Sequence, residues 1–300
     1  MLKNIACLWQ NKQHRIAPYL FISPFYILFA VFMVYPLCFG LYLSLHEWSG
    51  IGEMTYVGLG NYVNLLKDPD FHLAFSNTLW YMGASLVINL VFSLLLAVLL
   101  NSALIKAKKL FRTIYFVPIV TSVVAAAIVF TLFYDRDYGL FNVLFMALGR
   151  KPLDWLGSTS LSKLAVIGLI AWRWTGFNMV YFLAGLQSIP RSLYEAAVVD
   201  GASPLQSFLK ITLPLLKPVI LFVVVITLIG SIQIFDEPYI LTGGGPADSS
   251  MSLVIYLFRT GMEYLNLGYA AAIGFIIFGM TFILSWIQIN LMGGFEGEKS

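Results

Sequence analysis

Long apolar stretches separated by short polar segments dominate the chain. A membrane-spanning helix needs about 20 apolar residues. Five such stretches, 16–46, 71–105, 113–134, 218–235 and 264–295, contain no Asp, Glu, Lys or Arg, and a sixth, 164–190, is broken only by Arg173. They predict an all-α integral membrane protein with six transmembrane helices, at 18–45, 75–100, 113–134, 163–186, 215–235 and 270–292. The first stretch is too long for one straight crossing, and its Pro24 and Pro36 predict a kink or a start along the membrane surface.

The composition agrees with a membrane protein that is embedded in the lipid bilayer. The chain is 59% hydrophobic and 11% charged, with a mean hydropathy of +0.83, whereas soluble domains are about 25% charged. An ordinary soluble enzyme and a disordered protein are therefore excluded. The formal net charge of +3 is too small to indicate a nucleic-acid partner. The two cysteines, Cys7 and Cys38, do not suggest a disulfide framework.

Positively charged residues predict the orientation in the membrane. If the N-terminus is inside, 11 of the 18 Lys and Arg residues fall in inside segments and six in outside segments. Four of them crowd one short inside loop, at Lys106, Lys108, Lys109 and Arg112. Because cytoplasmic loops carry an excess of Lys and Arg, both termini are predicted to be cytoplasmic.

Sequence motifs for chemistry within this chain are absent. There is no G-x-x-x-x-G-K-[ST] phosphate-binding loop, since the glycine run 243–246 lacks the lysine. The histidines are scattered at His14, His46 and His72, so no metal site is expected. We expect a transporter or receptor subunit rather than an enzyme, with no cofactor of its own. If the protein pumps a solute, the energy comes from another protein.

The inside loop 187–214 is the most informative segment. It predicts two short helices with a bend at Gly201, a residue that readily adopts positive φ, and Pro204 suits the first turn of the second helix. The spacing predicts two capping boxes, Ser192 to Glu195 and Ser203 to Gln206. Exposed apolar side chains in this loop would be buried only against another protein.

A resemblance to a known family emerges from this loop. Its residues match the EAA loop of permease subunits of bacterial binding-protein-dependent ABC importers, in the order Glu195-Ala196-Ala197-x3-Gly201-x9-Ile211-x-Leu213-Pro214. Three flanking segments resemble the maltose/glycerol-phosphate-type carbohydrate branch: 18–44, Leu183–Pro190 and Leu241–Pro246.

The resemblance covers nearly the whole chain and implies a type I ABC importer permease fold. Residues 1–300 would form a single transmembrane permease domain, with 187–214 as its cytoplasmic coupling loop. The implied partners are a second permease subunit in a heterodimer, two cytosolic ATPases that bind ATP and Mg, and an extracytoplasmic solute-binding protein. The implied location is the bacterial inner membrane. Glu195 would contact the ATPase; alternatively, it only caps its own helix.

The resemblance also implies a sugar site on the fourth span. Counted back from Ile189-Pro190, three aromatic residues correspond to the stretch that lines the sugar: Trp172, Trp174 and Phe177. Since Trp172 and Trp174 lie about 200° apart on a regular helix, all three could face one cavity only through local unwinding near Gly176. The alternative is plain aromatic packing.

Polar residues complete the predicted substrate path. Arg173 departs from the family, and it either reaches toward water, pairs with Asp236, or contacts an acidic or hydroxyl-rich substrate. The remaining candidates are Asn178, Thr227, Ser231, Gln233 and Asp236. Thr227 and Ser231 are four residues apart and share a helix face, where they either contact the sugar or join two helices.

These observations predict a permease subunit of an ATP-driven ABC importer for a sugar or sugar derivative. Two alternatives are an ABC permease for a non-sugar solute and an ion-coupled secondary transporter. The latter predicts inverted repeats and a carboxylate relay at the midplane. Neither feature is found, because Asp236 and Glu237 lie at a membrane edge in the predicted topology.

The predicted orientation can be tested by thiol labelling in a variant without Cys7 and Cys38. A cysteine introduced by S300C is expected to be shielded from a membrane-impermeant reagent in intact cells, because the C-terminus is predicted to be cytoplasmic. A cysteine within 46–74 is expected to react. Labelling of the S300C variant in intact cells would contradict this orientation.

Overall fold

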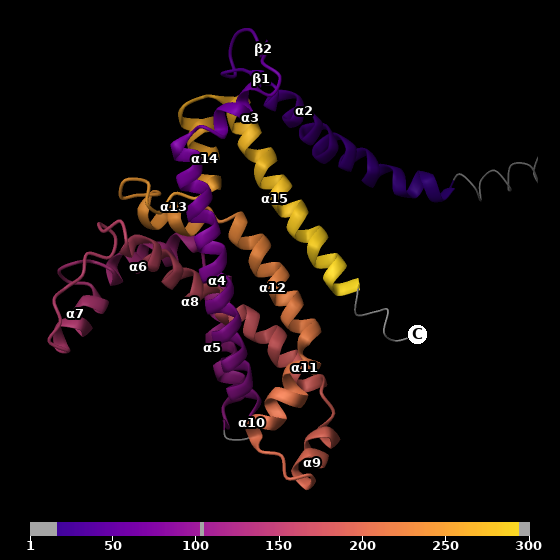
Figure 1. Cartoon of the computed structure of the whole chain (residues 1–300), viewed down its shortest axis with the longest axis vertical. Coiled ribbons are helices and arrows are strands. Elements are labelled where there is room, and N and C mark those ends of the chain that lie inside the picture. Colours follow the sequence, from indigo (N-terminus) through magenta and orange to yellow (C-terminus); the bar gives the residue numbers. More distant parts are fainter. Residues whose placement is uncertain (1–16, 103–104, 294–300) are drawn as a thin grey trace, which may run out of the picture. The chain divides into compact units, whose positions relative to one another are not determined.

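The computed structural model describes residues 17–102 and 105–293, most of them helical (Figure 1). The basic residues Lys3, Lys12, Arg15 and Lys299, which entered the orientation count, lie outside the described residues, as does Cys7. The described elements are η1 (Ala30–Val34), α2 (Tyr35–Ser44), β1 (His46–Glu47), β2 (Thr55–Tyr56), α3 (Gly60–Leu65), α4 (Pro69–Asn101), α5 (Lys108–Val120), α6 (Val123–Phe133), α7 (Leu140–Ala147), α8 (Leu161–Ser188), α9 (Arg191–Val199), α10 (Pro204–Ser207), η2 (Phe208–Thr212), α11 (Leu213–Leu215), α12 (Lys217–Ile232), α13 (Asp236–Thr242), α14 (Leu253–Phe258), η3 (Arg259–Glu263) and α15 (Leu267–Gly293).

Within the described residues, four helices are long and apolar enough to cross a membrane: Ala17–Ser44, Pro69–Asn101, Leu161–Ser188 and Leu267–Asn290. Two bent helix pairs raise the number to six if each is one span. The first helix contains the π-helical turn η1 directly before Pro36. This is where a proline interrupts the regular hydrogen-bond ladder.

The third span is not the single straight helix predicted at 113–134. Helices α5 and α6 meet at an angle of 101°. Thr121 and Ser122 between them have extended backbone, and the hydroxyl of Thr121 donates to the carbonyl of Pro118 at 2.7 Å. A local side-chain bond of this kind gives the backbone an alternative to helix, which hydropathy alone does not reveal. The fifth span also bends, by 65° where Leu215 meets Lys217.

The chain divides into two compact units. In the first unit, 1–64 with 260–275, a short antiparallel ribbon pairs His46 with Tyr56. The side-chain amide of Asn61 donates to the carbonyls of Ser44 and His46, each at 2.9 Å. These bonds satisfy backbone groups at the end of α2 that the helix itself leaves unpaired.

The second unit, 65–259 with 276–300, is organised along α8, which packs against α4 and α5 (Figure 1). The N-terminal half of α8 joins an apolar cluster with α6 that includes Leu169 and Phe130. The C-terminal half joins a second cluster with α4 and α12 that includes Phe182 and Leu216. Polar residues of α8 lie between these two apolar clusters.

Gly176 permits the close packing of α8 against α5. A Cβ atom at this position would lie 1.7 Å from the carbonyl oxygen of Tyr115. Helix pairs in membranes approach closely where small residues lie at the contact. Helix α8 is continuous through this point, so the predicted unwinding near Gly176 is wrong: this glycine serves helix packing.

Gly176→Ala is expected to destabilise the fold, because its methyl group would force α5 and α8 apart; overpacking typically costs about 1–3 kcal/mol. Gly83→Ala on α4 is the matched control, since a Cβ there meets no atom within 4 Å. Alanine is favoured over glycine in a helix by about 1 kcal/mol, so the control is expected to be neutral or stabilising. Thermal unfolding in nanodiscs measures both, and equal melting temperatures would contradict this packing role.

Candidate functional site

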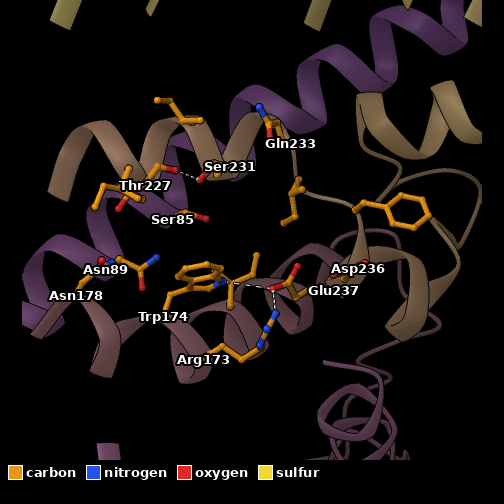
Figure 2. Close-up of a pocket in the computed structure, with 16 residues that line it drawn as sticks. Ser85, Asn89, Arg173, Trp174, Asn178, Thr227, Ser231, Gln233, Asp236 and Glu237 are labelled. Atoms are coloured by element: carbon orange, nitrogen blue, oxygen red, sulfur yellow. Dashed lines mark hydrogen bonds and ion pairs between the residues drawn. The ribbon is translucent and has the colours of Figure 1, made fainter. Parts of the chain in front are cut away.

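A cavity of about 500 Å³ opens between α4, α8, α12 and the segment that leads into α13 (Figure 2). Its apolar part is formed mainly by isoleucines and by the indole of Trp174. Its polar residues are Ser85, Asn89, Arg173, Asn178, Thr227, Ser231, Gln233, Asp236 and Glu237. The cavity therefore combines one large aromatic face with many hydrogen-bonding groups, as small-molecule sites usually do.

An ion pair forms one wall of this cavity. Nη1 of Arg173 lies 2.6 Å from Oε1 of Glu237, and the two side chains are only 12% and 7% exposed. The indole Nε1 of Trp174 donates to the same carboxylate oxygen at 3.4 Å. A buried charge is costly unless it is paired and hydrogen-bonded. Glu237 therefore offsets the energetic cost of burying the charge of Arg173. The predicted alternative, an ion pair between Arg173 and Asp236, is wrong.

Asp236 lies beside the ion pair and carries a further negative charge. It begins α13 and its side chain is exposed toward the cavity. No ion pair of Asp236 occurs among the described residues. A carboxylate in the first turn of a helix is stabilised by the backbone N–H groups there. Asp236 is therefore favourably placed in the first turn of α13.

Hydroxyl and amide groups occupy the other side of the cavity. The hydroxyl of Ser231 donates to the carbonyl of Thr227 at 2.7 Å, which satisfies its hydrogen within α12. The Thr175 hydroxyl lies 3.4 Å from Oδ1 of Asn89 and links α8 to α4. Ser85 Oγ is buried and has no hydrogen-bond partner among the described residues. Figure 2 shows the Trp174 side chain between these groups and the ion pair.

The structure separates the aromatic residues that the sequence grouped together. Trp174 lines the cavity, whereas Trp172 and Phe177 do not. Trp172 is 41% exposed and packs against Phe130, with ring centroids 5.4 Å apart. Phe177 packs between Trp174 and Tyr181. Because α8 stays regular, residues two apart cannot face the same side.

The other predicted path residues do meet at this cavity: Arg173, Asn178, Thr227, Ser231, Gln233 and Asp236. Sequence reasoning missed Glu237 and Ser85. A signal for Glu237 was present, because an intramembrane arginine requires a carboxylate partner and two adjacent acidic residues were available. Ser85 gave no signal, since serine is common in apolar helices. Asn89 joins α4 to α8 through its contact with Thr175.

The inside loop folds locally much as predicted. Gly201 has φ +73° between α9 and α10, and the Ser203–Gln206 capping box is complete. The predicted box from Ser192 to Glu195 is wrong, because α9 begins after Pro190 and has no side-chain cap.

The EAA-loop residues differ in exposure. Glu195, Ala196, Gly201 and Pro214 are exposed, Ile211 and Leu213 are half-buried, and Ala197 is buried. Tyr194 is hydrogen-bonded to Thr212 at 2.8 Å, which ties α9 to η2. These four positions are thus accessible at the surface of the loop.

Comparison with known proteins places most of the chain in one family. Residues 89–292 match the family model described as binding-protein-dependent transport system inner membrane component. The arabinooligosaccharides transport system permease protein AraP of Bacillus subtilis strain 168 is 40% identical over 95% of this chain and 91% of its own length. The lactose transport system permease protein LacF of Rhizobium radiobacter is 39% identical over 93% of this chain and 94% of its own.

Similarity extends to a more distant sugar permease and to a solved structure. The trehalose/maltose transport system permease protein MalF of Thermococcus litoralis is 36% identical over 89% of this chain and 88% of its own length. A crystal structure of a bacterial ABC transporter involved in the import of the acidic polysaccharide alginate matches with a TM-score of 0.82. That match has 25% identity and covers 95% of this chain and 97% of the other.

The energetic role of the ion pair can be tested by a double-mutant cycle. Arg173→Met and Glu237→Gln are each expected to reduce the free energy of unfolding by about 3 kcal/mol. Each substitution leaves the other member of the pair as a buried charge without a partner. The double variant is expected to lose less free energy of unfolding than the two single variants lose together, since no unpaired charge remains. The control is Asp248→Asn, which breaks the more exposed Arg259–Asp248 pair and is expected to cost about 0–1 kcal/mol. Additive single effects at Arg173 and Glu237 would refute this role.

Proposed function

Because the chain belongs to the family of binding-protein-dependent transport system inner membrane components, we propose that it is a permease subunit that carries a sugar or sugar derivative. The substrate passes through the cavity between α4, α8 and α12. Residues 1–300 act as one transmembrane permease domain, with 187–214 as its coupling loop. The protein lies in the bacterial inner membrane with both termini in the cytoplasm.

One observation carries the assignment of the substrate path. Trp174 presents its indole to a cavity whose lining combines apolar side chains, mainly isoleucines, with hydroxyl, amide and charged groups. Sugars have apolar C–H faces that stack on aromatic rings and a rim of hydroxyls that need hydrogen-bond partners. The buried Ser85 hydroxyl, unpartnered among the described residues, is one such partner. Asn89 and Asn178 supply amide donors and acceptors nearby.

The names of the relatives support a saccharide as the substrate. Those relatives are named for arabinooligosaccharides, for lactose and for trehalose and maltose. They span most of this chain, so the likeness includes every element that forms the cavity. The alternatives of a non-sugar solute and of an ion-coupled transporter have no comparable support.

The exposed loop around Gly201 supports a second part of the proposal, which concerns partners. Two cytosolic ATPases bind ATP and Mg, and one of them docks on this chain through Glu195, Ala196 and Gly201. Ala197, which is buried, Ile211 and Leu213, which are half-buried, and the exposed Pro214 complete the motif of the coupling loop. A second permease subunit completes the pathway as a heterodimer.

An extracytoplasmic solute-binding protein delivers the sugar. A structural neighbour in complex with a periplasmic protein that holds an alginate pentasaccharide supports this arrangement. That match has a TM-score of 0.81 and 26% identity.

The loop is connected to the cavity by helix α8 on one side and, after a 65° bend, by α12 on the other. Helix α8 carries Trp174 at the cavity and ends at Ser188, directly before the loop. The loop then leads through η2 and α11 into α12, which carries Thr227 and Ser231. A displacement of the loop by ATPase closure therefore moves two walls of the cavity together. Rigid helices transmit such displacements because packed interiors resist compression.

Trp174→Ala is expected to slow sugar uptake about tenfold at limiting substrate, because the stacking face is lost; such contacts contribute about 0.5–1.5 kcal/mol beyond burial. Trp172→Ala is the matched control, since it removes the same side chain two residues away from a position outside the cavity. Uptake of labelled arabinotriose, lactose and maltose into proteoliposomes measures both. Equal uptake by the two variants at normal expression would overturn the assigned path.

Gly201→Val is expected to abolish transport while the protein still inserts, because a β-branched residue at φ +73° costs about 1–2 kcal/mol and would straighten the bend. Gly201→Asn is the matched control, since asparagine tolerates positive φ. It is expected to keep most of the uptake. Full uptake and normal ATPase co-purification in the valine variant would show that this bend has no role in coupling.

A further inference from the structure

The charges that line the cavity distinguish between classes of sugar. Three lining residues are ionisable: Arg173, Asp236 and Glu237. Their formal charges sum to one negative charge at neutral pH. A cavity with low-dielectric walls intensifies the field of such groups. The net charge therefore opposes an anionic ligand, even though the cavity contains an arginine.

Arg173 is the group in this cavity that would bind a carboxylate, and Glu237 already occupies it. The distance of 2.6 Å from Nη1 to Oε1 is that of a strong charge-assisted bond. The Trp174 indole donates to the same oxygen and helps to hold the carboxylate in place. Arginine forks bind carboxylates in preference to most other groups. An incoming acidic sugar would have to displace a carboxylate that is fixed within the protein.

The guanidinium also retains unused donor capacity. Arg173 Nε is buried and has no hydrogen-bond partner among the described residues. Its cationic centre lies 5.8 Å from the Trp174 ring centroid, so the arginine adjoins the proposed stacking face. A ligand stacked on Trp174 would therefore lie close enough to Arg173 for its affinity to depend on whether the charge of Arg173 is neutralised.

We infer that Glu237 is a specificity-determining residue: it masks Arg173 and, with Asp236, restricts the cavity to uncharged saccharides. This inference rests on the proposed function, since it concerns the same cavity. Neutral hydroxyls find partners in the serine, threonine and asparagine side chains, while the carboxylate of a uronic acid finds no free cation. Binding sites often gain specificity through unfavourable interactions with the wrong ligand, such as a charge left without a partner.

The test uses the assembled transporter in nanodiscs at neutral pH without its solute-binding protein, so that only the permeases discriminate. The neutral probes are arabinotriose, lactose and maltose. The acidic probes are the same sugars with the terminal hydroxymethyl group of the non-reducing residue oxidised to a carboxylate. Equilibrium binding of each pair gives the ratio of the affinity for the acidic sugar to the affinity for the neutral sugar. A substitution that weakens the binding of both sugars equally leaves this acid-to-neutral ratio unchanged.

Wild-type protein is expected to favour the neutral member of each pair that it binds. Glu237→Gln is expected to raise the acid-to-neutral ratio about tenfold, the value of one new charge-assisted bond. The double variant R173Q/E237Q is expected to return to the wild-type ratio, because it has the wild-type net charge and no exposed arginine. Asp137→Asn is the matched control, since it removes one exposed carboxylate that does not line the cavity.

Asp236→Asn provides a second route if Glu237→Gln fails to assemble. Its side chain is exposed and makes no ion pair among the described residues, and its removal leaves the buried pair intact. The ratio is expected to rise, by a smaller factor than in Glu237→Gln. An unchanged ratio in every variant that assembles, or a wild-type preference for the acid, would overturn the inference. If wild-type protein binds no member of any pair, the proposed sugar cavity itself fails and the inference falls with it.

Discussion

The packing of α8 against α4 and α5 is the contact on which the rest of the second unit depends. It becomes possible because Gly176 leaves room for the carbonyl of Tyr115. Apolar clusters hold the helix at both ends, through Leu169 toward α6 and through Phe182 toward α12. Between these two clusters, polar residues of α8 face inward, while the apolar contacts at both ends hold the helix in place. A cavity with a defined wall thus arises in a helix that is otherwise apolar.

The ion pair of Arg173 with Glu237 is the second constraint on this region. It joins α8 to α13 through two side chains that are largely removed from solvent. A buried pair of this kind contributes little net stability relative to apolar residues of similar size. Removing only one of its two partners, however, strongly destabilises the fold. Such a pair therefore suits the proposed role in selecting the ligand better than a role in strengthening the fold. The adjacent Asp236 adds charge to the same region without joining the pair.

The continuity of α8 into the inside loop relates the site to the proposed energy source. Ser188 ends α8 and Pro190 is the N-cap of α9, so only two residues separate a cavity-forming helix from the first helix of the predicted coupling loop. Proline at this point prevents one helix from running into the next. The bend at Gly201 then turns the chain back toward α12, the opposite wall of the cavity.

Features that depend on local interactions could be predicted from the amino-acid sequence. Hydropathy located the long helices because burial in lipid demands an uninterrupted apolar stretch. The Ser203–Gln206 capping box and the positive φ of Gly201 were predictable because each involves residues close together in the chain. The match to the EAA loop identified the family for the same reason, since its pattern is a short run of fixed spacing.

The set of side chains that meet at the cavity, by contrast, depends on how the helices pack together. Arg173 could have paired with either of two adjacent carboxylates, and the direction of α13 selected Glu237. Trp172 and Trp174 are chemically identical, and the rotation of α8 against its neighbours sent only Trp174 into the cavity. The sharp bend at Thr121 and the tight contact of Gly176 also depend on partners distant in sequence or on competing local bonds. Periodicity fixes the angles between side chains on one helix, but it does not specify which face meets which neighbour.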